Sequence, residues 1–389
     1  MRKFLSILIF AIVLAFSASA IDIDSADDIF ALMNKADGFD DYSATYVLTK
    51  DIDLSEYSGS LLQKPIGTST SDVFTGTFDG DGYKISGISL SGGQYSGLFG
   101  VLGGTVKNLT VSGSVSSGSA NDAGGIAGLA YNNATVINCT NECTVSGKND
   151  PAGIVGRIKG SDFTISGCVN RGNISGVREA AGIVGYVDAS GTALIFGCEN
   201  YGTVSLTGTN ERAGGIVGAT ALKGTITIEK CVNHGNVSGT KNIGGIVGLF
   251  QGSDSATSDV ATRILTECVN KAIVTSTATS GDARVGGVVG WAKNVGCITD
   301  SLNEGKVSSV VERIGGFVGG TEGYANIGYC YSRGSVSSSA TGDYVGTFGG
   351  FMLYKPHLPN YASLKGSGKE WVNVAKYAAS VFDTSVHRA

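Results

Sequence analysis

The sequence predicts an all-β fold, a single-stranded parallel β-helix of about eight coils with helix-containing caps at its N- and C-terminal ends. Two observations favour this solenoid. A short Gly-rich motif returns at intervals of about 30 residues, and a second motif follows it in phase. Short β-branched segments between Gly and Asn are typical of strands joined by tight turns. If each repeat forms one coil, equivalent residues stack at about 4.8 Å, the spacing between strands.

The first motif is Gly-Gly-Ile-Val-Gly at residues 244–248, and close copies recur along most of the chain. A fixed period in this range is typical of solenoids, in which each repeat is one structural unit. The interval from Gly245 to Gly287 is the longest, at 42 residues. The copies stand at 96–100, 124–128, 152–156, 181–185, 214–218, 286–290 and 315–319, and a worn copy stands at 346–349.

The second motif reads Cys-x-Asn-x-Gly-x-Val, as at residues 231–237, and aligns the repeats into columns. The Val column predicts inward side chains that each contribute about 1.5–3 kcal/mol through burial. The Cys column predicts small buried side chains at a tight corner. The Asn column is expected to stack its amides along the axis and, like the Gly two residues later, to accept a left-handed backbone. The Asn column is Asn141, Asn170, Asn200, Asn233, Asn270 and Asn303, and the Val column is Val115, Val145, Ile174, Val204, Val237, Val274, Val307 and Val336.

Residues 1–20 have the pattern of a secretory signal peptide. Arg2 and Lys3 precede an apolar run, and Ala18-Ser19-Ala20 forms a small-residue cleavage site. No membrane span is expected after its removal. The formal net charge of −5 becomes −7 without the two basic residues of this segment, which argues against a nucleic-acid partner.

The segments on either side of the repeat region, 96–350, predict caps. In residues 21–95, a helix is expected from Ile21 to Asn34 with Ser25 as its N-cap, followed by strands near 45–48 and 52–54. In residues 351–389, apolar residues at helical spacing around Trp371 predict a closing helix or tail. Caps are expected because an uncovered solenoid end recruits other chains.

The repeats resemble a known family. The Gly-Leu-Phe-Gly at residues 97–100 and its copies, each followed by the Cys-x-Asn-x-Gly-x-Val segment, are similar to the GLUG motif, and residues 74–88 resemble the lead-in common in that family. The resemblance covers about residues 51–350. It implies a parallel β-helix in secreted or surface proteins, including bacterial adhesins and non-catalytic parts of IgA-cleaving proteases. It implies no shared catalytic residues.

One ligand site is predicted in the longest repeat, because long loops on a rigid scaffold tend to carry binding residues. The loops at residues 251–262 and 275–283 flank it, and an exposed Trp beside charged residues can stack on a sugar ring. The structural alternative is that the Trp covers the core. The predicted ligand residues are Asp254, Asp259, Arg284, Trp291 and Arg313.

A charged column lies three residues before each marker Gly. Acids and bases roughly alternate along it, so we expect neighbouring coils to offset each other's charge along a solvated edge, with a polar binding strip as the alternative. The column is Asp122, Asp150, Glu179, Arg212, Asn242, Arg284, Arg313 and Asp343.

Two kinds of covalent modification are candidates. Most cysteines are expected to be free buried thiols, and Cys139–Cys143 is the disulfide candidate. Five Asn-x-Ser/Thr sequons are glycosylation candidates in a cell that glycosylates, namely Asn108, Asn133, Asn138, Asn173 and Asn236.

No catalytic motif, metal site or cofactor site is recognisable in the sequence.

These features predict a non-enzymatic secreted or cell-surface repeat protein. It would act as an adhesin or extracellular interaction scaffold, with an extracellular protein or a glycan as its ligand. One alternative is a carbohydrate-active enzyme, a polysaccharide lyase or hydrolase, which would need a convergent cluster of carboxylates. Another alternative is a structural coat protein that works through its glycans and end-to-end packing.

Overall fold

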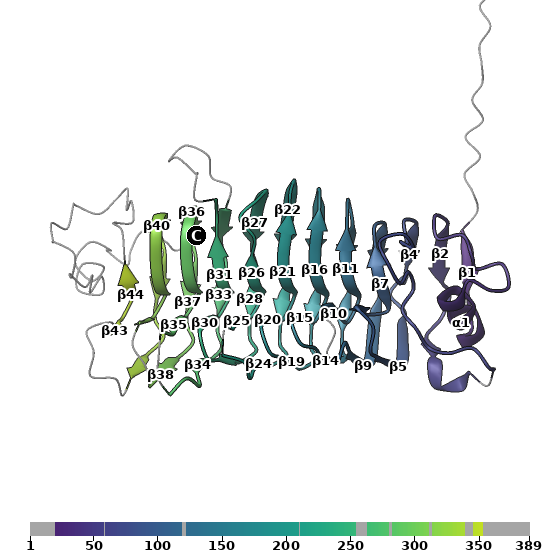
Figure 1. Cartoon of the computed structure of the whole chain (residues 1–389), viewed down its shortest axis with the longest axis horizontal. Helices are drawn as coiled ribbons and strands as arrows, with labels where there is room; N and C mark the ends of the chain where they lie inside the picture. Colours follow the sequence, from purple (N-terminus) through teal and green to yellow (C-terminus); the bar gives the residue numbers. More distant parts are fainter. Residues whose placement is uncertain are drawn as a thin grey trace, which may run out of the picture.

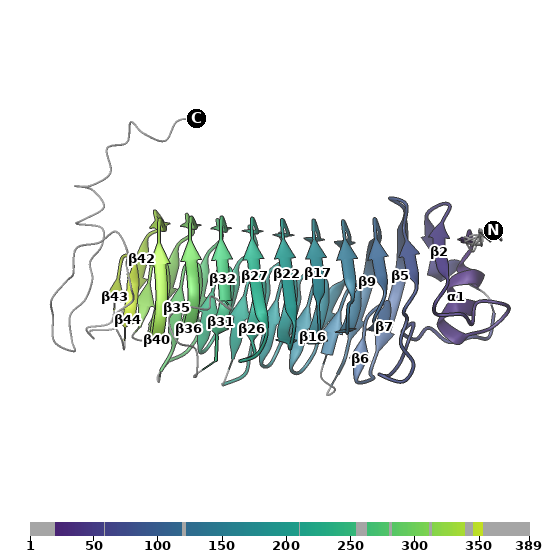
Figure 2. The ribbon, with the colours of Figure 1, turned by 90° about the horizontal axis from the view of Figure 1, so that it is seen from above.

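The computed structural model describes residues 20–57, 59–118, 122–209, 211–253, 263–279, 282–310, 313–338 and 345–352. Within them the chain forms a parallel β-solenoid whose coils lie side by side along one long axis (Figures 1 and 2). The predicted parallel β-helix is therefore confirmed. Nearly all of the predicted signal peptide and the whole predicted helix around Trp371 lie outside the described residues.

The coils build three parallel sheets. Sheet 1 has one short strand per coil, nine among the described residues, because the worn copy of the Gly motif also adds a strand to the eight that the closer copies predict. Its strands are β6 (Tyr95–Ser96), β10 (Asp122–Gly124), β15 (Asp150–Ala152), β20 (Glu179–Ala181), β25 (Arg212–Gly214), β30 (Asn242–Gly244), β35 (Arg284–Gly286), β39 (Ile314–Gly315) and β43 (Val345–Gly346).

Sheet 2 follows the Gly motif in each coil and runs the length of the solenoid. It comprises β1 (Ile21–Ile23), β2 (Thr45–Leu48), β4 (Thr77–Asp79), β7 (Phe99–Leu102), β8 (Thr105–Lys107), β11 (Ala127–Tyr131), β12 (Thr135–Ile137), β16 (Val155–Gly160), β17 (Phe163–Ser166), β21 (Val184–Ala189), β22 (Thr192–Phe196), β26 (Val217–Thr220), β27 (Thr225–Glu229), β31 (Val247–Gln251), β32 (Arg263–Thr266), β36 (Val289–Thr299), β40 (Val318–Gly328) and β44 (Gly349–Met352).

Sheet 3 carries the second motif. It comprises β3 (Ile52–Asp53), β5 (Lys84–Ser91), β9 (Thr110–Ser116), β13 (Thr140–Asn141), β14 (Thr144–Ser146), β18 (Val169–Asn170), β19 (Ile174–Gly176), β23 (Glu199–Asn200), β24 (Val204–Leu206), β28 (Val232–Asn233), β29 (Val237–Gly239), β33 (Val269–Asn270), β34 (Val274–Ser276), β37 (Leu302–Asn303), β38 (Val307–Ser309), β41 (Tyr331–Ser332) and β42 (Val336–Ser338).

The N-terminal end is covered by helix α1 (Ala26–Asn34), as Figure 1 shows. The predicted start of this helix at Ile21 is wrong, because Ile21–Ile23 forms strand β1, paired in parallel with β2. Ser25 is the N-cap, as predicted. Its hydroxyl accepts from the Asp28 amide at 3.3 Å, and the Asp28 carboxylate accepts from the Ser25 amide at 3.1 Å, which completes a capping box.

Replacing Ser25 by Ala should destabilise α1 by about 1 kcal/mol, the usual value of an N-cap side chain. We expect roughly 5-fold faster hydrogen exchange of the α1 amides, with the coils beyond β9 unaffected, because local openings report local stability. Ser175→Ala, on an exposed strand position, is the matched control. Equal exchange in the Ser25 variant and the wild type would contradict the capping assignment.

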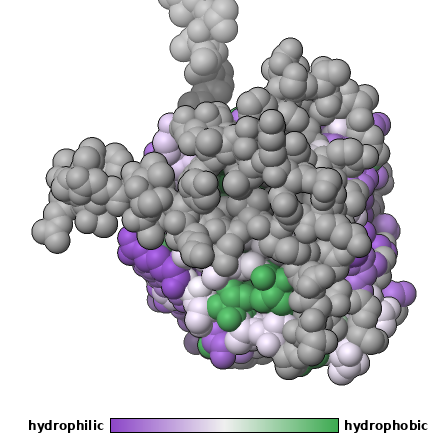
Figure 3. All heavy atoms as spheres, turned by 90° about the vertical axis from the view of Figure 1, so that its left-hand side faces the viewer, coloured by the Kyte–Doolittle hydropathy of each residue, from purple (hydrophilic) through white to green (hydrophobic). Residues whose placement is uncertain are grey.

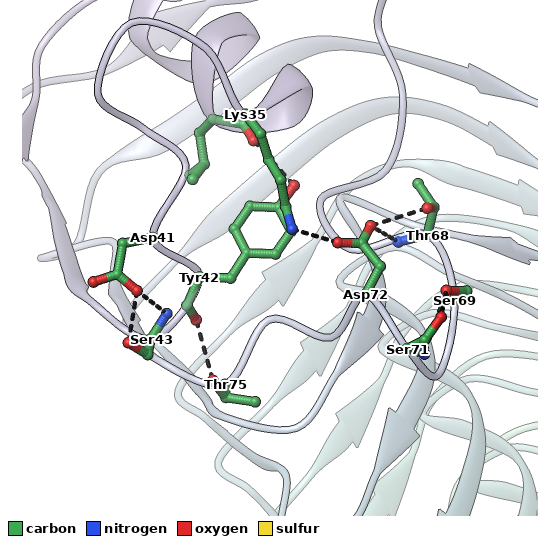
Figure 4. Close-up of polar contacts among 10 residues, drawn as sticks. Lys35, Asp41, Tyr42, Ser43, Thr68, Ser69, Ser71, Asp72 and Thr75 are labelled. Carbon is green, nitrogen blue, oxygen red and sulfur yellow. Dashed lines mark hydrogen bonds and ion pairs between the residues drawn. The ribbon is translucent and has the colours of Figure 1, made fainter.

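Polar contacts tie the end of α1 to the following loop (Figure 4). Lys35, the C-cap residue, lies in the left-handed region with φ 53°. Its Nζ lies 2.5 Å from Asp72 Oδ1 and 4.0 Å from the centre of the Tyr42 ring. Asp72 in turn accepts from the Thr68 amide and hydroxyl at 3.0 Å. The cap is therefore fixed by packing of α1 and by this charged cluster.

The end of the solenoid formed by β40 and β44 faces the viewer in Figure 3. Among the residues coloured there, a small hydrophobic patch lies beside hydrophilic side chains. Phe317 and Phe348 stack near this end with ring centres 5.0 Å apart. A stacked pair of aromatic rings thus forms part of the apolar interior in the last described coils.

The core is the stack of inward columns that the sequence predicts. Val145 pairs in register with Ile174, Ile174 with Val204, and Val204 with Val237. All four side chains are at most 1% exposed. Each coil therefore buries its β-branched residues mainly against its two neighbours.

The Asn column forms an unbroken ladder of amides. The Nδ2 of Asn200 donates to Oδ1 of Asn233 at 2.8 Å and to the carbonyl of Gly202 at 2.9 Å, and Oδ1 of Asn200 accepts from Asn170 at 2.8 Å. The same 2.8 Å bond joins each neighbouring pair from Asn141 to Asn303. Since every member is fully buried, the ladder satisfies polar groups that would otherwise be costly to bury.

The predicted left-handed positions are wrong. Neither the Asn column nor the Gly two residues later has a positive φ. The left-handed residue instead precedes the Cys column, as at Asn138 and Lys230. The Gly is required for another reason, since a Cβ on Gly202 would lie 1.9 Å from the carbonyl oxygen of Gly172 in the preceding coil.

The Cys column is buried and reduced. Each thiol of the Cys column, which lies just before sheet 3, donates to the carbonyl two residues earlier, as Cys231 does to Glu229 at 3.3 Å. Burial raises the pKa of the Cys198 and Cys231 thiols well above the ordinary value. All eight cysteines are free, so the structure forms no Cys139–Cys143 disulfide.

The Gly motif closes a sharp corner between sheets 1 and 2. A Cβ on Gly244 would lie 2.0 Å from the Val247 carbonyl oxygen, and a Cβ on Gly248 would lie 2.8 Å from the Ala213 amide nitrogen of the preceding coil. Sheet 1 and the start of sheet 2 therefore pack backbone against backbone. Side chains just before and just after the motif meet at the rim of this corner.

Candidate functional site

A polar pocket opens at the rim where sheets 1 and 2 diverge. Its volume is about 340 Å³. It draws side chains from β15, β20 and β25 of sheet 1 and from β16 and β21 of sheet 2. The lining residues are Asn149, Asp150, Arg157, Arg178, Glu179, Tyr186 and Arg212.

Arg157 organises the sheet 2 side of the pocket. One of its guanidinium nitrogens lies 3.1 Å from Asp188 Oδ2, and the other lies 3.5 Å from Asp150 Oδ2. The guanidinium carbon lies 4.8 Å from the centre of the Tyr186 ring. Arg157 is therefore held by charge and by a cation–π contact in one orientation.

Glu179 organises the sheet 1 side. It pairs with Arg212 of the next coil and lies 3.5 Å from Arg178. This pair confirms the expected charge compensation between neighbouring coils at one place in the charged column. The expected solvated edge is wrong, since Glu179 is only 4% exposed. The backbone packing of sheets 1 and 2 buries most of the described members of the column, whereas Arg212 and Arg313 are partly exposed.

Asp122 and Asp150 are stacked neighbours of like charge. They occupy equivalent positions of β10 and β15, and each is 3% exposed. Burial raises the pKa of Asp122, and burial together with the charges of Asp122 and Glu179 raises the pKa of Asp150 well above its usual range. Two acids are therefore adjacent in a column where acids and bases only roughly alternate, and a proton shared by the pair would relieve their repulsion.

Replacing Asp122 by Asn should raise the free energy of unfolding at pH 8. The folded-state pKa of this acid lies above its unfolded value, so the wild type is relieved of repulsion at low pH and loses that stability as pH rises through the folded pKa. The amide of Asn can donate to Asp150 at every pH. We expect a gain at pH 8 of the roughly 1 kcal/mol that a net intramolecular hydrogen bond contributes, and a smaller gain towards pH 4.

Urea unfolding at pH 8 and pH 4 checks this sign. Arg157, Lys159, Tyr95 and Glu179 also act on the pair, and they are the same in both proteins. Asp162→Asn, at a fully exposed acid, is the control, with no comparable gain expected. If the wild type is instead more stable than the variant at pH 8, the prediction is wrong, and neighbouring groups compensate the negative charge of Asp122 in the folded state.

The structure brings together three of the predicted ligand residues. The guanidinium of Arg284 lies 4.0 Å from the centre of the Trp291 ring, and Asp282 pairs with both Arg284, at 3.0 Å, and Arg313. Arg284 is 8% exposed, and burial lowers its pKa. Trp291 is partly buried. Asp254 and Asp259 lie outside the described residues.

Both clusters lie on one line along the solenoid, which we call the charged edge. In sheet 1, the register links Glu179 to Arg212, Asn242 and Arg284. In sheet 2, the register runs through Arg157, Tyr186, Ala219, Leu249 and Trp291. The pocket and the Arg284–Trp291 cluster are therefore equivalent places on different coils.

Sequence reasoning missed Arg157, Tyr186 and Asp282. Arg157 and Tyr186 stand one residue after the last Gly of the motif, in a column whose other members are uncharged, among them Val101, Leu129, Ala219, Leu249, Trp291 and Gly320. The signal available in the sequence was Arg157, a charged residue in a column that is mostly apolar. Asp282 lies in a loop that the repeat length did mark, but its partners are not evident from spacing.

The sequons differ in exposure. Asn108 is only partly exposed, and its side chain donates to Asp79 at 3.0 Å. Asn133, Asn138, Asn173 and Asn236 are exposed. Glycosylation at these four stays a prediction, and Asn108 is the least accessible of the five.

The described residues offer neither a metal-binding cluster nor a membrane-spanning helix. No group of three or more His, Cys, Asp or Glu side chains in that part of the chain is placed to hold a metal ion. No helix there is long and apolar enough to cross a membrane.

Comparison with known proteins identifies the repeat. A family model described as "The GLUG motif" matches residues 311–337, the coil that includes β39 to β42. The chain carries the GLUG motif. The resemblance predicted from the repeat columns is thus confirmed, and the GLUG segment corresponds to one coil of the solenoid.

One curated relative and one solved structure are similar to this chain. Halomucin of Haloquadratum walsbyi (strain DSM 16790 / HBSQ001) is 34% identical over 140 residues, which is 34% of this chain and 2% of halomucin. The chain therefore spans a small part of that relative's length. A crystal structure from Bacteroides ovatus, described as a candidate immunoglobulin A1 protease, is 19% identical, with 85% of this chain and 82% of that chain covered and a TM-score of 0.43.

Proposed function

We propose that this GLUG protein is a secreted or cell-surface repeat scaffold that binds extracellular glycans, as an adhesin does, without catalysing a reaction on them. The observation that carries the proposal is the charged edge, where a pocket rich in hydrogen-bonding groups sits on a rigid stack of coils. Long loops and pockets on rigid scaffolds are the usual places for recognition. The similarity to halomucin supports a surface or secreted setting.

The pocket chemistry suits a sugar. Carboxyl, guanidinium, amide and phenol groups converge there, so the lining offers both donors and acceptors. Sugar hydroxyls also donate and accept. The charges of Arg157, Arg178 and Arg212 are offset by Asp150, Glu179 and Asp188. The site therefore favours a polar ligand over a strongly charged one.

A carbohydrate-active enzyme is the second candidate. Asp122 and Asp150 favour it, because a buried carboxyl with a raised pKa can donate a proton near neutral pH. Their position on adjacent strands argues for a shared proton instead. Adjacent strands lie about 4.8 Å apart, which is too close for the roughly 6.5–9.5 Å of inverting glycosidases but near the roughly 5–5.5 Å of retaining ones. The near-complete burial of both carboxyl groups is what argues against a retaining mechanism.

The test incubates the chain from Ile21 onward with a panel of polysaccharides and follows retention and size distribution together. We expect retention of at least one polysaccharide with no shortening. Shortened chains would establish the enzyme instead. If nothing is retained or shortened, the glycan proposal is wrong and an extracellular protein becomes the partner to seek.

A further inference from the structure

Asp150 has an oxygen in the pocket that the fold leaves without a hydrogen bond. The residue is 3% exposed, and its Oδ2 has no hydrogen-bond partner. The nearest cation is Arg157, with nitrogen and oxygen 3.5 Å apart, longer than the roughly 2.7–2.9 Å of a charge-assisted hydrogen bond. Buried polar atoms are almost always bonded, so an exception inside a pocket indicates a missing partner.

Two donors in the same pocket share this property. The Nε atoms of Arg157 and Arg212 are buried and have no hydrogen-bond partner, although the outer nitrogens of both guanidinium groups are paired. Asp122 Oδ1, one coil away, is also without a partner. An acceptor and two donors are therefore available in a space of about 340 Å³, within the usual range of roughly 300–1,000 Å³ for small-ligand sites.

The rest of the charged edge does not repeat this arrangement. In the cluster at Trp291, Asp282 pairs with both Arg284 and Arg313, and the Trp291 ring is covered by Arg284. Within the pocket, Arg157 likewise covers a face of Tyr186, so aromatic stacking is not the main source of affinity there. A ligand in the pocket would therefore be held mainly by hydrogen bonds at Asp150.

We propose that this pocket is a subsite for one neutral hexose unit of a polysaccharide. Two neighbouring hydroxyls of the sugar donate to Asp150 Oδ2 and accept from the Nε–H groups of Arg157 and Arg212. The three guanidinium groups of the lining are offset by its two acids and by Asp188, which pairs with Arg157 but is not itself a lining residue. This offset favours a neutral unit over a uronate. This inference rests on the proposed glycan binding and adds the subsite and the class of sugar.

The test titrates the full chain with neutral oligosaccharides of glucose, galactose and mannose, and with an oligouronate, by calorimetry. Asp150→Ala and Asp150→Asn should weaken binding of the retained neutral oligosaccharide by at least 10-fold. Glu304→Ala, at an exposed acid on sheet 3, should leave the affinity unchanged. Thermal melts check that each variant folds.

A second measurement needs no variant. In proton–nitrogen correlation spectra of the wild type, the Nε–H signals of Arg157 and Arg212 should shift on sugar binding, and those of Arg178 should shift less. Unchanged affinity in the Asp150 variants, or unmoved Arg157 and Arg212 signals, would place the sugar elsewhere and leave the proposed function standing. Binding of the oligouronate alone would overturn the neutral class. No binding of any sugar or polysaccharide would overturn both proposals.

Discussion

Replacing Val237 by Asp should abolish cooperative folding of the middle coils. Val237 is 1% exposed and stacks between Val204 and Val274. A carboxylate there would be buried without a partner among apolar side chains. We expect a loss of more than about 4 kcal/mol, which is exceptional for a single substitution. Far-UV circular dichroism during heating measures the loss.

The control for this variant is Ser238→Asp, because Ser238 follows Val237 on the same strand and is partly exposed. Its melting curve should stay close to that of the wild type. Limited proteolysis should cut the Val237 variant first near β29, since each coil contacts mainly its two neighbours. An unchanged melting curve for Val237→Asp would contradict inward stacking of this column.

Replacing Asn200 by Ala should destabilise the chain by about 2–4 kcal/mol, because each buried group left without a partner costs about 1–3 kcal/mol. The change removes the 2.8 Å bonds to Asn170 and Asn233 and the 2.9 Å bond to Gly202. Chemical unfolding measures the loss.

Asn173→Ala is the matched control for the ladder. Asn173 is exposed, and its side chain accepts only from Thr203, at 2.8 and 3.1 Å. We expect less than about 0.5 kcal/mol for this surface change. Equal losses at Asn200 and Asn173 would mean that the ladder contributes no more than an exposed hydrogen bond does.

The columns were predictable because repetition makes them visible. A Val or Ile recurs at the place of Val204 in all eight aligned repeats, and Asn recurs at the place of Asn200 in six of them, so stacking at the strand spacing follows directly. The reason for Gly202 was not predictable in the same way. Gly is favoured both where the backbone is left-handed and where a neighbouring carbonyl leaves no room for a side chain. Only the position of the Gly172 carbonyl shows that the second reason applies at Gly202.

The site was predictable only in part. Repeat length marked the cluster of Arg284, Trp291 and Arg313, which the structure brings together around Asp282. Asp150, Glu179 and Arg212 were predicted only as part of a possible polar strip. The pocket that they form with Arg157 and Tyr186 was missed, because spacing shows which residues share a column but not which columns meet across the corner. The burial of the pocket residues was missed for the same reason, because that burial depends on the backbone packing of sheets 1 and 2.

The central claim is that each repeat is one coil, so that residues from distant repeats form continuous lines along the axis. Spin labels on cysteines introduced at exposed positions test this by pulsed electron spin resonance. Glu142, Lys271 and Arg333 share one column of sheet 3, each one residue beyond the Asn ladder or its Ser332 continuation. A Cys297→Ser background removes the one native thiol that is not buried.

The register places Lys271 four coils and Arg333 six coils from Glu142. At about 4.8 Å per coil, the two label pairs should give narrow distributions near 19 and 29 Å, apart from the length of the labels. Their difference of about 10 Å should remain whatever the label geometry. Broad distributions, or equal distances for the two pairs, would contradict one coil per repeat and with it the charged edge.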